Sequence, residues 1–458
     1  MMYDFAESLK GHMYPYLPAC FECISAVATD KHSSDGRASA SQTLSKLFDA
    51  AVNAVHIGAA PSSFAVSAME TCIEKMLLVL RDEINAESRV SAAEAMRDIL
   101  CSCYEAGGVE NGDGSIPASF CKPEISSCAT ICAGLLECCQ ASLERRNEKE
   151  TSIKRNEGLD DEDREALQEV LEGENDLLEI LVDALGQLVK IHGPAFMPIF
   201  DSAIAPALTQ YLAPNHPEGL QVVAVCMIDD AIEFGGSMAY KYIPQALTVF
   251  LKNISSKSAL LRQCSTYGIA VSLRSCPDAC MPSVGSILSA LGEIISSASA
   301  SAENEDNIGT TENALFALGT LCTRPEYRGI VGGNLETMVG LWLNRLPLTA
   351  DERQAKTVHR ELCSAIESGD SAVIGASYKH LYEIIRTLSA VCDYESKRLS
   401  SDNNENPCVA HAQTIQRMKS ILKFFGGNSD PSVMQLVQST YAGLSPDLQS
   451  SFQSAISS

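Results

Sequence analysis

Carboxylates are the most concentrated reactive groups in this sequence. Between Glu157 and Glu179 there are eleven Asp and Glu residues and one cation, Arg164. The densest part is Asp160, Asp161, Glu162 and Asp163. Such a run attracts basic proteins at long range, and added salt weakens the attraction because the Debye length is roughly 8 Å at physiological ionic strength. The alternative is a solvated loop with no specific partner. We expect a mobile acidic insertion over residues 144–175.

Two smaller polar groups are candidates for the same chemistry. Asp229 and Asp230 are followed one turn later by Glu233, and Glu312 is followed by Asn313. Both groups lie on the second helices of predicted helical hairpins. If these helices line one surface, their acids form a ladder that faces a basic partner. The alternative is the ordinary polar face of an amphipathic helix.

No catalytic, metal or cofactor site is predicted. Cys20 and Cys23 form a C-x-x-C pair without a second pair at zinc spacing, so core cysteines are the better interpretation. The histidines show no H-E-x-x-H pattern, the Gly-Gly pairs are not followed by the Lys-Ser/Thr of a phosphate loop, and no nucleophile elbow is present. We therefore expect no enzyme activity.

Composition excludes several classes of partner. The 458 residues carry a formal net charge of −24 at pH 7, which disfavours nucleic acid and anionic membranes as main partners. We find neither a run of about 20 apolar residues nor a signal-peptide profile at the start. Cysteines such as Cys128, Cys132 and Cys139 lie within apolar stripes, which predicts reduced thiols in the core of a cytosolic or nuclear protein.

The elements that must position the acidic groups are clearest between residues 307 and 368. Three apolar stripes recur there at three-then-four spacing, which is typical of amphipathic helices. Their members are Ile308, Thr311, Leu315, Leu318 and Cys322; Leu335, Met338, Trp342 and Leu346; and Ala355, Val358, Leu362 and Ile366. Pro347 ends the second helix, and Thr349 is the predicted N-cap of the third. Helices this short are stable only when neighbours cover their stripes.

The spacing of helices along the chain predicts a repeat protein. Pro198, Pro244 and Pro282 mark the starts of successive first helices, 46 and 38 residues apart, which is close to the period of HEAT and armadillo units. We predict an all-α, right-handed superhelical solenoid of about nine HEAT-type hairpins. The expected division is HEAT-like repeats at 1–143, the acidic insertion at 144–175, further repeats at 176–426 and a capping hairpin at 427–458.

From about Asp176 to the end, the chain resembles the carboxy-terminal half of importin-β3 type karyopherin-β nuclear transport receptors. The resemblance rests on four segments in the same order and spacing. They are CMIDDAIEF at Cys226 to Phe234, NIGTTENALFALGTL at Asn307 to Leu321, WLNRLPL at Trp342 to Leu348, and LCSAIES at Leu362 to Ser368. The acidic stretch before Asp176 also resembles the acidic segment of these receptors.

The resemblance implies a receptor that carries basic cargo proteins through the nuclear pore, binds phenylalanine-glycine nucleoporins and moves between cytoplasm and nucleus. Asp229, Asp230, Glu233, Glu312 and Asn313 are the cargo-binding residues it suggests. Ran-GTP is expected as a partner only with the family's amino-terminal repeats, which have no counterpart here, so the chain is expected to be a carboxy-terminal arch: a fragment, an incomplete gene model or a shortened paralogue. The alternative is a HEAT scaffold or adaptor that holds a multiprotein complex together.

Overall fold

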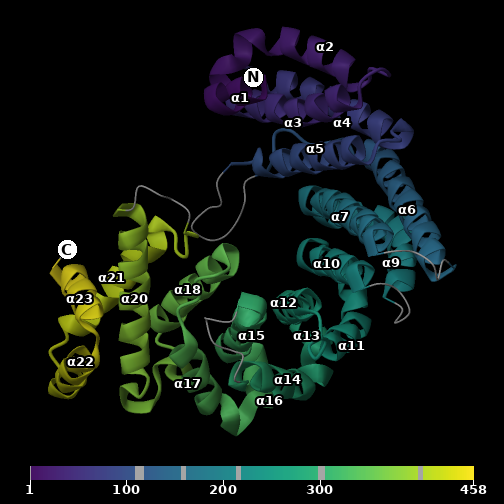
Figure 1. The fold of residues 1–458 in the computed structure, drawn as a ribbon. Helices are drawn as coiled ribbons and strands as arrows, with labels where there is room; N and C mark the ends of the chain where they lie inside the picture. The colour runs from purple at the N-terminus through teal and green to yellow at the C-terminus, as the bar shows by residue number, and fades with distance from the viewer. Residues whose placement is uncertain are drawn as a thin grey trace. The chain divides into compact units, whose positions relative to one another are not determined.

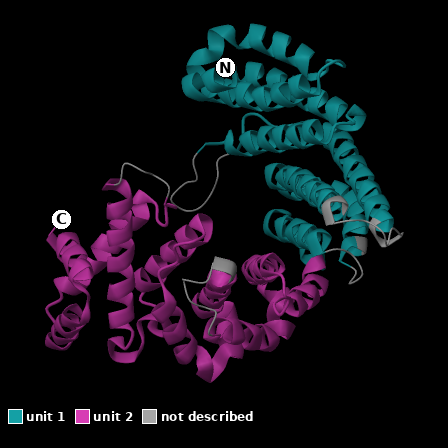
Figure 2. Cartoon of the chain, in the orientation of Figure 1, with its two compact units in different colours: residues 1–111, 115–241 teal, residues 112–114, 242–458 magenta. Residues whose placement is uncertain are grey.

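The computed structural model describes residues 2–108, 118–155, 161–212, 218–297, 305–400 and 406–457. Within these ranges the regular secondary structure is helical (Figure 1). The chain divides into two compact units (Figure 2): Met1–Asn111 with Ser115–Lys241, and Gly112–Gly114 with Tyr242–Ser458. The predicted fold, an all-α solenoid of helical hairpins, is confirmed.

The first unit stacks its helices in two layers. Its main helices are α1 (Met2–Leu9), α2 (Leu17–Ala28), α3 (Ser34–His56), α4 (Ser62–Asp82), α5 (Ala86–Glu105), α6 (Ile125–Arg155), α7 (Asp161–His192), α9 (Ala205–Tyr211) and α10 (Glu218–Phe234). First helices α2, α4 and α6 pack in succession, and second helices α3, α5, α7 and α10 pack in a parallel succession. Each hairpin thus covers the apolar face of the previous one.

The second unit repeats this arrangement. Its main helices are α11 (Ile243–Asn253), α12 (Ala259–Ser275), α13 (Pro277–Cys280), α14 (Val284–Ser296), α15 (Glu305–Thr323), α16 (Arg328–Val331), α17 (Leu335–Arg345), α18 (Glu352–Glu367), α19 (Ser371–Ile374), α20 (Leu381–Ser400), α21 (Ala412–Gly426), α22 (Pro431–Gly443) and α23 (Pro446–Ser457). Second helices α12, α15, α18 and α21 stack in order. The stack is tight where Trp342 of α17 meets Gly319 of α15, because a Cβ at Gly319 would lie 2.7 Å from the indole nitrogen.

The three helices predicted between residues 307 and 368 are confirmed as α15, α17 and α18. Ala355, Val358 and Leu362 of the third stripe are at most 1% exposed. The predicted N-cap at Thr349 is wrong: Asp351 caps α18, and its carboxylate accepts a hydrogen bond of 2.8 Å from the backbone N–H of Gln354. The backbone N–H of Thr349 is bound by a side chain of α15, as described below.

Most of the predicted acidic insertion belongs to two long helices. Residues 144–155 continue α6, and residues 161–175 form the start of α7. Residues 156–160, which include Asp160, lie outside the described residues. The domain boundaries given above remain predictions.

One stretch of the second unit, Pro277–Ser296, has the length and the mean hydropathy, 1.3, of a membrane span. A 3-10 turn at Met281–Ser283 divides it into α13 and α14. Ile287, Leu291 and Ile295 are at most 1% exposed, and α14 packs against α15. One face of α14 is therefore packed in the core of the second unit, and 33% of the apolar stretch is buried.

A buried glutamate links two hairpins of the second unit. Glu312 on α15 is 6% exposed, and its carboxylate accepts hydrogen bonds from the backbone N–H groups of Thr349, Ala350 and Asp351 at 2.7 to 3.1 Å. Its neighbour Asn313 donates a hydrogen bond of 2.8 Å to the carbonyl of Gln263 on α12. Because burying a carboxylate is costly unless it is hydrogen-bonded, these contacts fix how the segment before α18 meets α15.

The next hairpin uses the same device. Glu395 on α20 is 4% exposed and accepts hydrogen bonds from the backbone N–H groups of Val409 and Ala410 at 2.6 and 3.1 Å. His359 on α18 is completely buried, with Nδ1 2.9 Å from the carbonyl oxygen of Val409 and Nε2 3.3 Å from the backbone nitrogen of Leu348. A carbonyl only accepts and a backbone N–H only donates, so His359 is neutral with its proton on Nδ1.

In the first unit Glu174 joins three helices. Its carboxylate on α7 accepts hydrogen bonds from Ser142 and Arg145 of α6, at 2.5 and 2.7 Å, and lies 3.6 Å from Arg89 of α5. Burial alone would raise the pKa of Glu174, but the hydrogen bonds from Arg145 and Ser142 outweigh it and lower that pKa. The glutamate therefore stays ionised inside the helix stack.

Replacing Glu312 by alanine should destabilise the chain by about 3 kcal/mol, because three buried backbone N–H groups lose their acceptor. Urea unfolding followed by circular dichroism measures this. The matched control is Glu326→Ala, an exposed position where the change should stay within about 0.5 kcal/mol. Equal stability of the two variants would contradict the linking role of Glu312.

Acidification should destabilise the second unit through His359. Burial lowers the pKa of His359 to about 4, below the value of about 6.5 in an unfolded chain. The unfolded state therefore binds the proton more readily, and stability falls as the pH drops from about 6.5 towards 4, by up to roughly 3 kcal/mol. Urea unfolding at several pH values should show this loss, and His359→Gln should show a smaller loss over the same window. An unchanged slope in that variant would rule out His359 as the cause.

Candidate functional site

The candidate acids on α10 occupy three different environments. Asp229 is 3% exposed, its Oδ1 has no hydrogen-bond partner, and burial raises its pKa well above the usual range. Asp230 is ion-paired with Lys190 of α7 at 3.4 Å, and burial raises its pKa to about 6 despite this cation. Glu233 is partly exposed. Asp230 and Glu233 are therefore the two that carry charge near the surface at neutral pH.

Glu312 and Asn313 are both buried and bound to the backbone of neighbouring segments. This placement gives them a structural role. They belong to the second unit and the acids of α10 to the first, so neither unit holds all five candidates. Their assignment to cargo binding remains a prediction.

Carboxylates of α7 form a continuous stripe that the sequence run alone did not reveal. At 100° per residue, exposed positions three and four apart share one face of a helix. These positions are Glu165, Glu169, Glu172, Asp176, Glu179 and Asp183. Partial burial and then the neighbouring Asp176 raise the pKa of Glu179. The side chains of Asp161, Glu162 and Asp163, in the first turn of α7, lie outside the described side chains.

The neighbouring second helices extend this stripe. Helix α5 carries Glu87, Glu94, Asp98 and Glu105 on one face at similar spacing, with each side chain exposed or partly exposed. Helices α5 and α10 both pack against α7, and the charge of Asp183 acts on Arg97 of α5 and on Asp230 of α10. We call these carboxylates of α5 and α7, with Asp230 and Glu233 of α10, the acidic face.

Two cations beside the acidic face are already paired. Arg97 donates to Asp98 at 2.8 Å, and Lys190 pairs with Asp230. The remaining carboxylates give the face a strong negative potential, which favours Lys- and Arg-rich ligands. Sequence reasoning missed Glu94, Asp98 and Asp183 because they are isolated in the sequence. A search for carboxylates at the three- and four-residue spacing that defines apolar stripes would have identified them.

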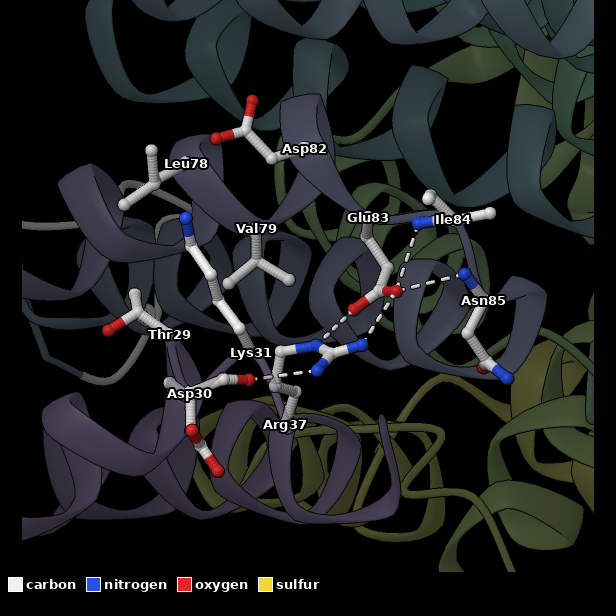
Figure 3. A pocket seen from close by; sticks show the side chains of 11 residues that line it. Thr29, Asp30, Lys31, Arg37, Leu78, Val79, Asp82, Glu83, Ile84 and Asn85 are labelled. Atoms are coloured by element: carbon white, nitrogen blue, oxygen red, sulfur yellow. Dashed lines mark hydrogen bonds and ion pairs between the residues drawn. The ribbon is translucent and has the colours of Figure 1, made fainter. Parts of the chain in front are cut away.

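A groove of about 740 Å³ lies in the same unit (Figure 3). It lies between the α2–α3 connection and the end of α4, where Leu78 and Val79 form apolar walls. Asp30, Lys31 and Asp82 also line it, so charges of both signs meet there. This balance gives the groove no preference for ligand charge.

The main polar contact of the groove is internal (Figure 3). Arg37 donates to both carboxylate oxygens of Glu83, at 2.5 and 2.9 Å, and to the carbonyl of Asp30 at 2.8 Å. These hydrogen bonds from Arg37 lower the pKa of Glu83. The contact therefore holds α3 to the end of α4. Of the two features, the acidic face is the stronger candidate for binding a partner.

The cysteines fit a structural role. Cys128, Cys132 and Cys139 of α6 are at most 2% exposed, as predicted, whereas of the C-x-x-C pair Cys20 is buried and Cys23 exposed. Burial raises the pKa of the Cys132 thiol to about 11, which favours the unreactive protonated form. Among the described residues, no group of three or more His, Cys, Asp or Glu is arranged to hold a metal ion.

Comparisons with known proteins find similarity to importins and karyopherins. Residues 119–214 match the family model of importin repeat 6. A probable importin-5 homolog of Dictyostelium discoideum is 24% identical over 231 residues, which are 48% of this chain and 21% of that protein.

Solved structures of the karyopherin Kap121p share the fold. Kap121p bound to RanGTP matches 99% of this chain with a TM-score of 0.65, and Kap121p bound to Nup53p matches 95% of this chain with a TM-score of 0.62. Both are 17% identical to this chain, which spans 36% of each. The matched repeat, the sequence relative and the shared fold show that the chain is similar to importins in sequence and to a karyopherin in fold, over part of the length of those proteins.

Proposed function

We propose that the chain is a nuclear transport receptor of the importin-β family, or the carboxy-terminal arch of one. It binds basic cargo proteins and phenylalanine-glycine nucleoporins and supports protein import between cytoplasm and nucleus. The observation that carries the proposal is the importin repeat at residues 119–214. Part of the acidic face lies within this repeat, on α7.

The acidic face supports binding of basic cargo. Its carboxylates lie on packed helices, so their spacing is fixed before a partner arrives. Pre-organised charges of one sign speed association and lose strength as salt screens them. The net charge of −24 extends this preference for basic partners to the whole chain.

The nucleoporin and Ran parts of the proposal rest on Kap121p, which has been solved with Nup53p and with RanGTP. This chain spans 36% of Kap121p, so we propose nucleoporin binding for it and assign Ran-GTP binding only to a protein that includes the amino-terminal repeats. The chain acts by binding and release rather than by catalysis.

Affinity capture on phenylalanine-glycine repeats tests the proposal. The purified chain should be retained by immobilised phenylalanine-glycine peptide, released by competing free peptide, and not retained by the matching serine-glycine peptide. It should also bind a Lys/Arg-rich cargo in a salt-dependent manner. A chain that binds neither ligand but copurifies with a stable enzyme complex would instead be the scaffold of the alternative hypothesis.

Neutralising residues 160–163 by Asp→Asn and Glu→Gln should slow association with a basic cargo several-fold at low salt, because four charges that steer the encounter are lost. Stopped-flow or surface-based kinetics measures the rate, and circular dichroism should show unchanged helical content. At high salt the two proteins should associate at similar rates.

The matched control neutralises four exposed carboxylates elsewhere, Glu22, Glu70, Glu74 and Glu326, each to Gln. It changes the net charge by the same amount. If both sets slow association equally, overall charge is the cause and the acidic run has no special role.

A further inference from the structure

Asp230 holds an unusual position on the acidic face. Its carboxylate packs against α7 at Gly186, where any Cβ would overlap it, and it lies 3.4 Å from Lys190. Both side chains of the pair are 19% exposed. The pair is therefore mostly buried between α7 and α10, and its exposed part remains open to a ligand.

The groups around this pair are mostly acidic. Asp183 of α7 and Glu233 of α10 both act on Asp230 with like charge. Asp229 lies beneath the face, buried, with the thiol of Cys226 as a further neighbour. Other elements that contact α10 are the short helices at 193–196 and 236–238, which contain no ionisable residue, α9, and α5, where the ring of Tyr104 lies 6.3 Å from that of Phe234. The only ionisable residue of α9, Tyr211, is influenced by Cys139.

We propose that Asp230 is a proton switch of the acidic face: when it takes up a proton, it releases Lys190 and thereby weakens the binding of basic partners. The ammonium group of Lys190 loses the carboxylate at 3.4 Å and turns to the remaining carboxylates, of which Asp183 lies two turns away on the same face of α7. The face then presents one more positive charge to an incoming Lys or Arg.

The protonation equilibrium supports this role, since Asp230 changes charge near pH 6, close to neutrality. Linkage makes the effect reciprocal: a basic partner that favours ionised Asp230 also expels its proton. The inference rests on the proposed function, because it regulates the same acidic face. It adds to that function a dependence of partner affinity on pH.

The test measures the affinity of the full chain for rhodamine-labelled oligolysine by fluorescence anisotropy between about pH 5 and pH 8, at constant ionic strength; oligolysine stays charged over this range. The wild-type chain should lose about three- to fivefold in affinity on acidification, with a midpoint near pH 6. Asp230→Asn imitates the protonated state, so its affinity should be low and independent of pH.

Two further variants define the outcomes. The double variant Asp230→Asn with Lys190→Gln leaves the pair without net charge, as in the ionised wild-type pair. Its affinity for oligolysine should therefore match wild type near pH 8 and should not change with pH. Glu172→Gln removes one charge of the face without touching the pair, so it should bind more weakly but keep the pH profile. Thermal unfolding by circular dichroism checks that each variant is folded.

A pH profile of Asp230→Asn that equals the wild-type profile would overturn the switch, because groups other than Asp230 would then cause the pH dependence of the affinity. No binding of oligolysine by the wild-type chain at any pH would count against the acidic face and the proposed function. Binding that is constant with pH would contradict the switch alone.

Discussion

The buried glutamates that accept hydrogen bonds from neighbouring helices and connecting segments are the constraint on which the helix stack depends. Apolar burial drives helices together but has no direction, so it leaves the position of one helix on the next poorly defined. Glu312, Glu395 and Glu174 supply that direction, because each holds a carboxylate where only fixed donors compensate its lost hydration. A helix that shifted against its neighbour would leave a buried charge without partners, which costs several kcal/mol.

Helix α7 uses the same residue type for a second purpose on its exposed side. On α7, Glu174 is buried and bound to α6, whereas Glu172 is exposed on the acidic face. Two residues along a helix correspond to a rotation of about 200°, so one side chain points into the stack and the other towards solvent. The rigidity that Glu174 gives to α5, α6 and α7 thus fixes the spacing of the exposed carboxylates.

The fold was predictable from the sequence, and the site only in part. Apolar stripes such as Ala355, Val358 and Leu362 locate a helix and its buried face, because burial is periodic and leaves a repeating pattern. The N-cap of α18 lies at Asp351 instead of the predicted Thr349, in a segment whose backbone N–H groups bind Glu312, which is 37 residues from Thr349 in sequence. Local patterns do not contain such long-range hydrogen bonds. For the same reason, the burial of Glu312 and Asn313 could not be distinguished from an exposed polar face.

The acidic face illustrates the opposite case, in which distant residues act together without touching. Glu94, Asp183 and Glu233 come from three helices, and each alone is an ordinary surface carboxylate. Stacking of α5, α7 and α10 brings their helices side by side, so their potentials add over distances comparable to the Debye length. A partner held by such a summed field needs no single deep pocket and can leave quickly when one contact changes. Protonation of Asp230 in its pair with Lys190 changes this summed field, so one proton alters the potential of the whole acidic face.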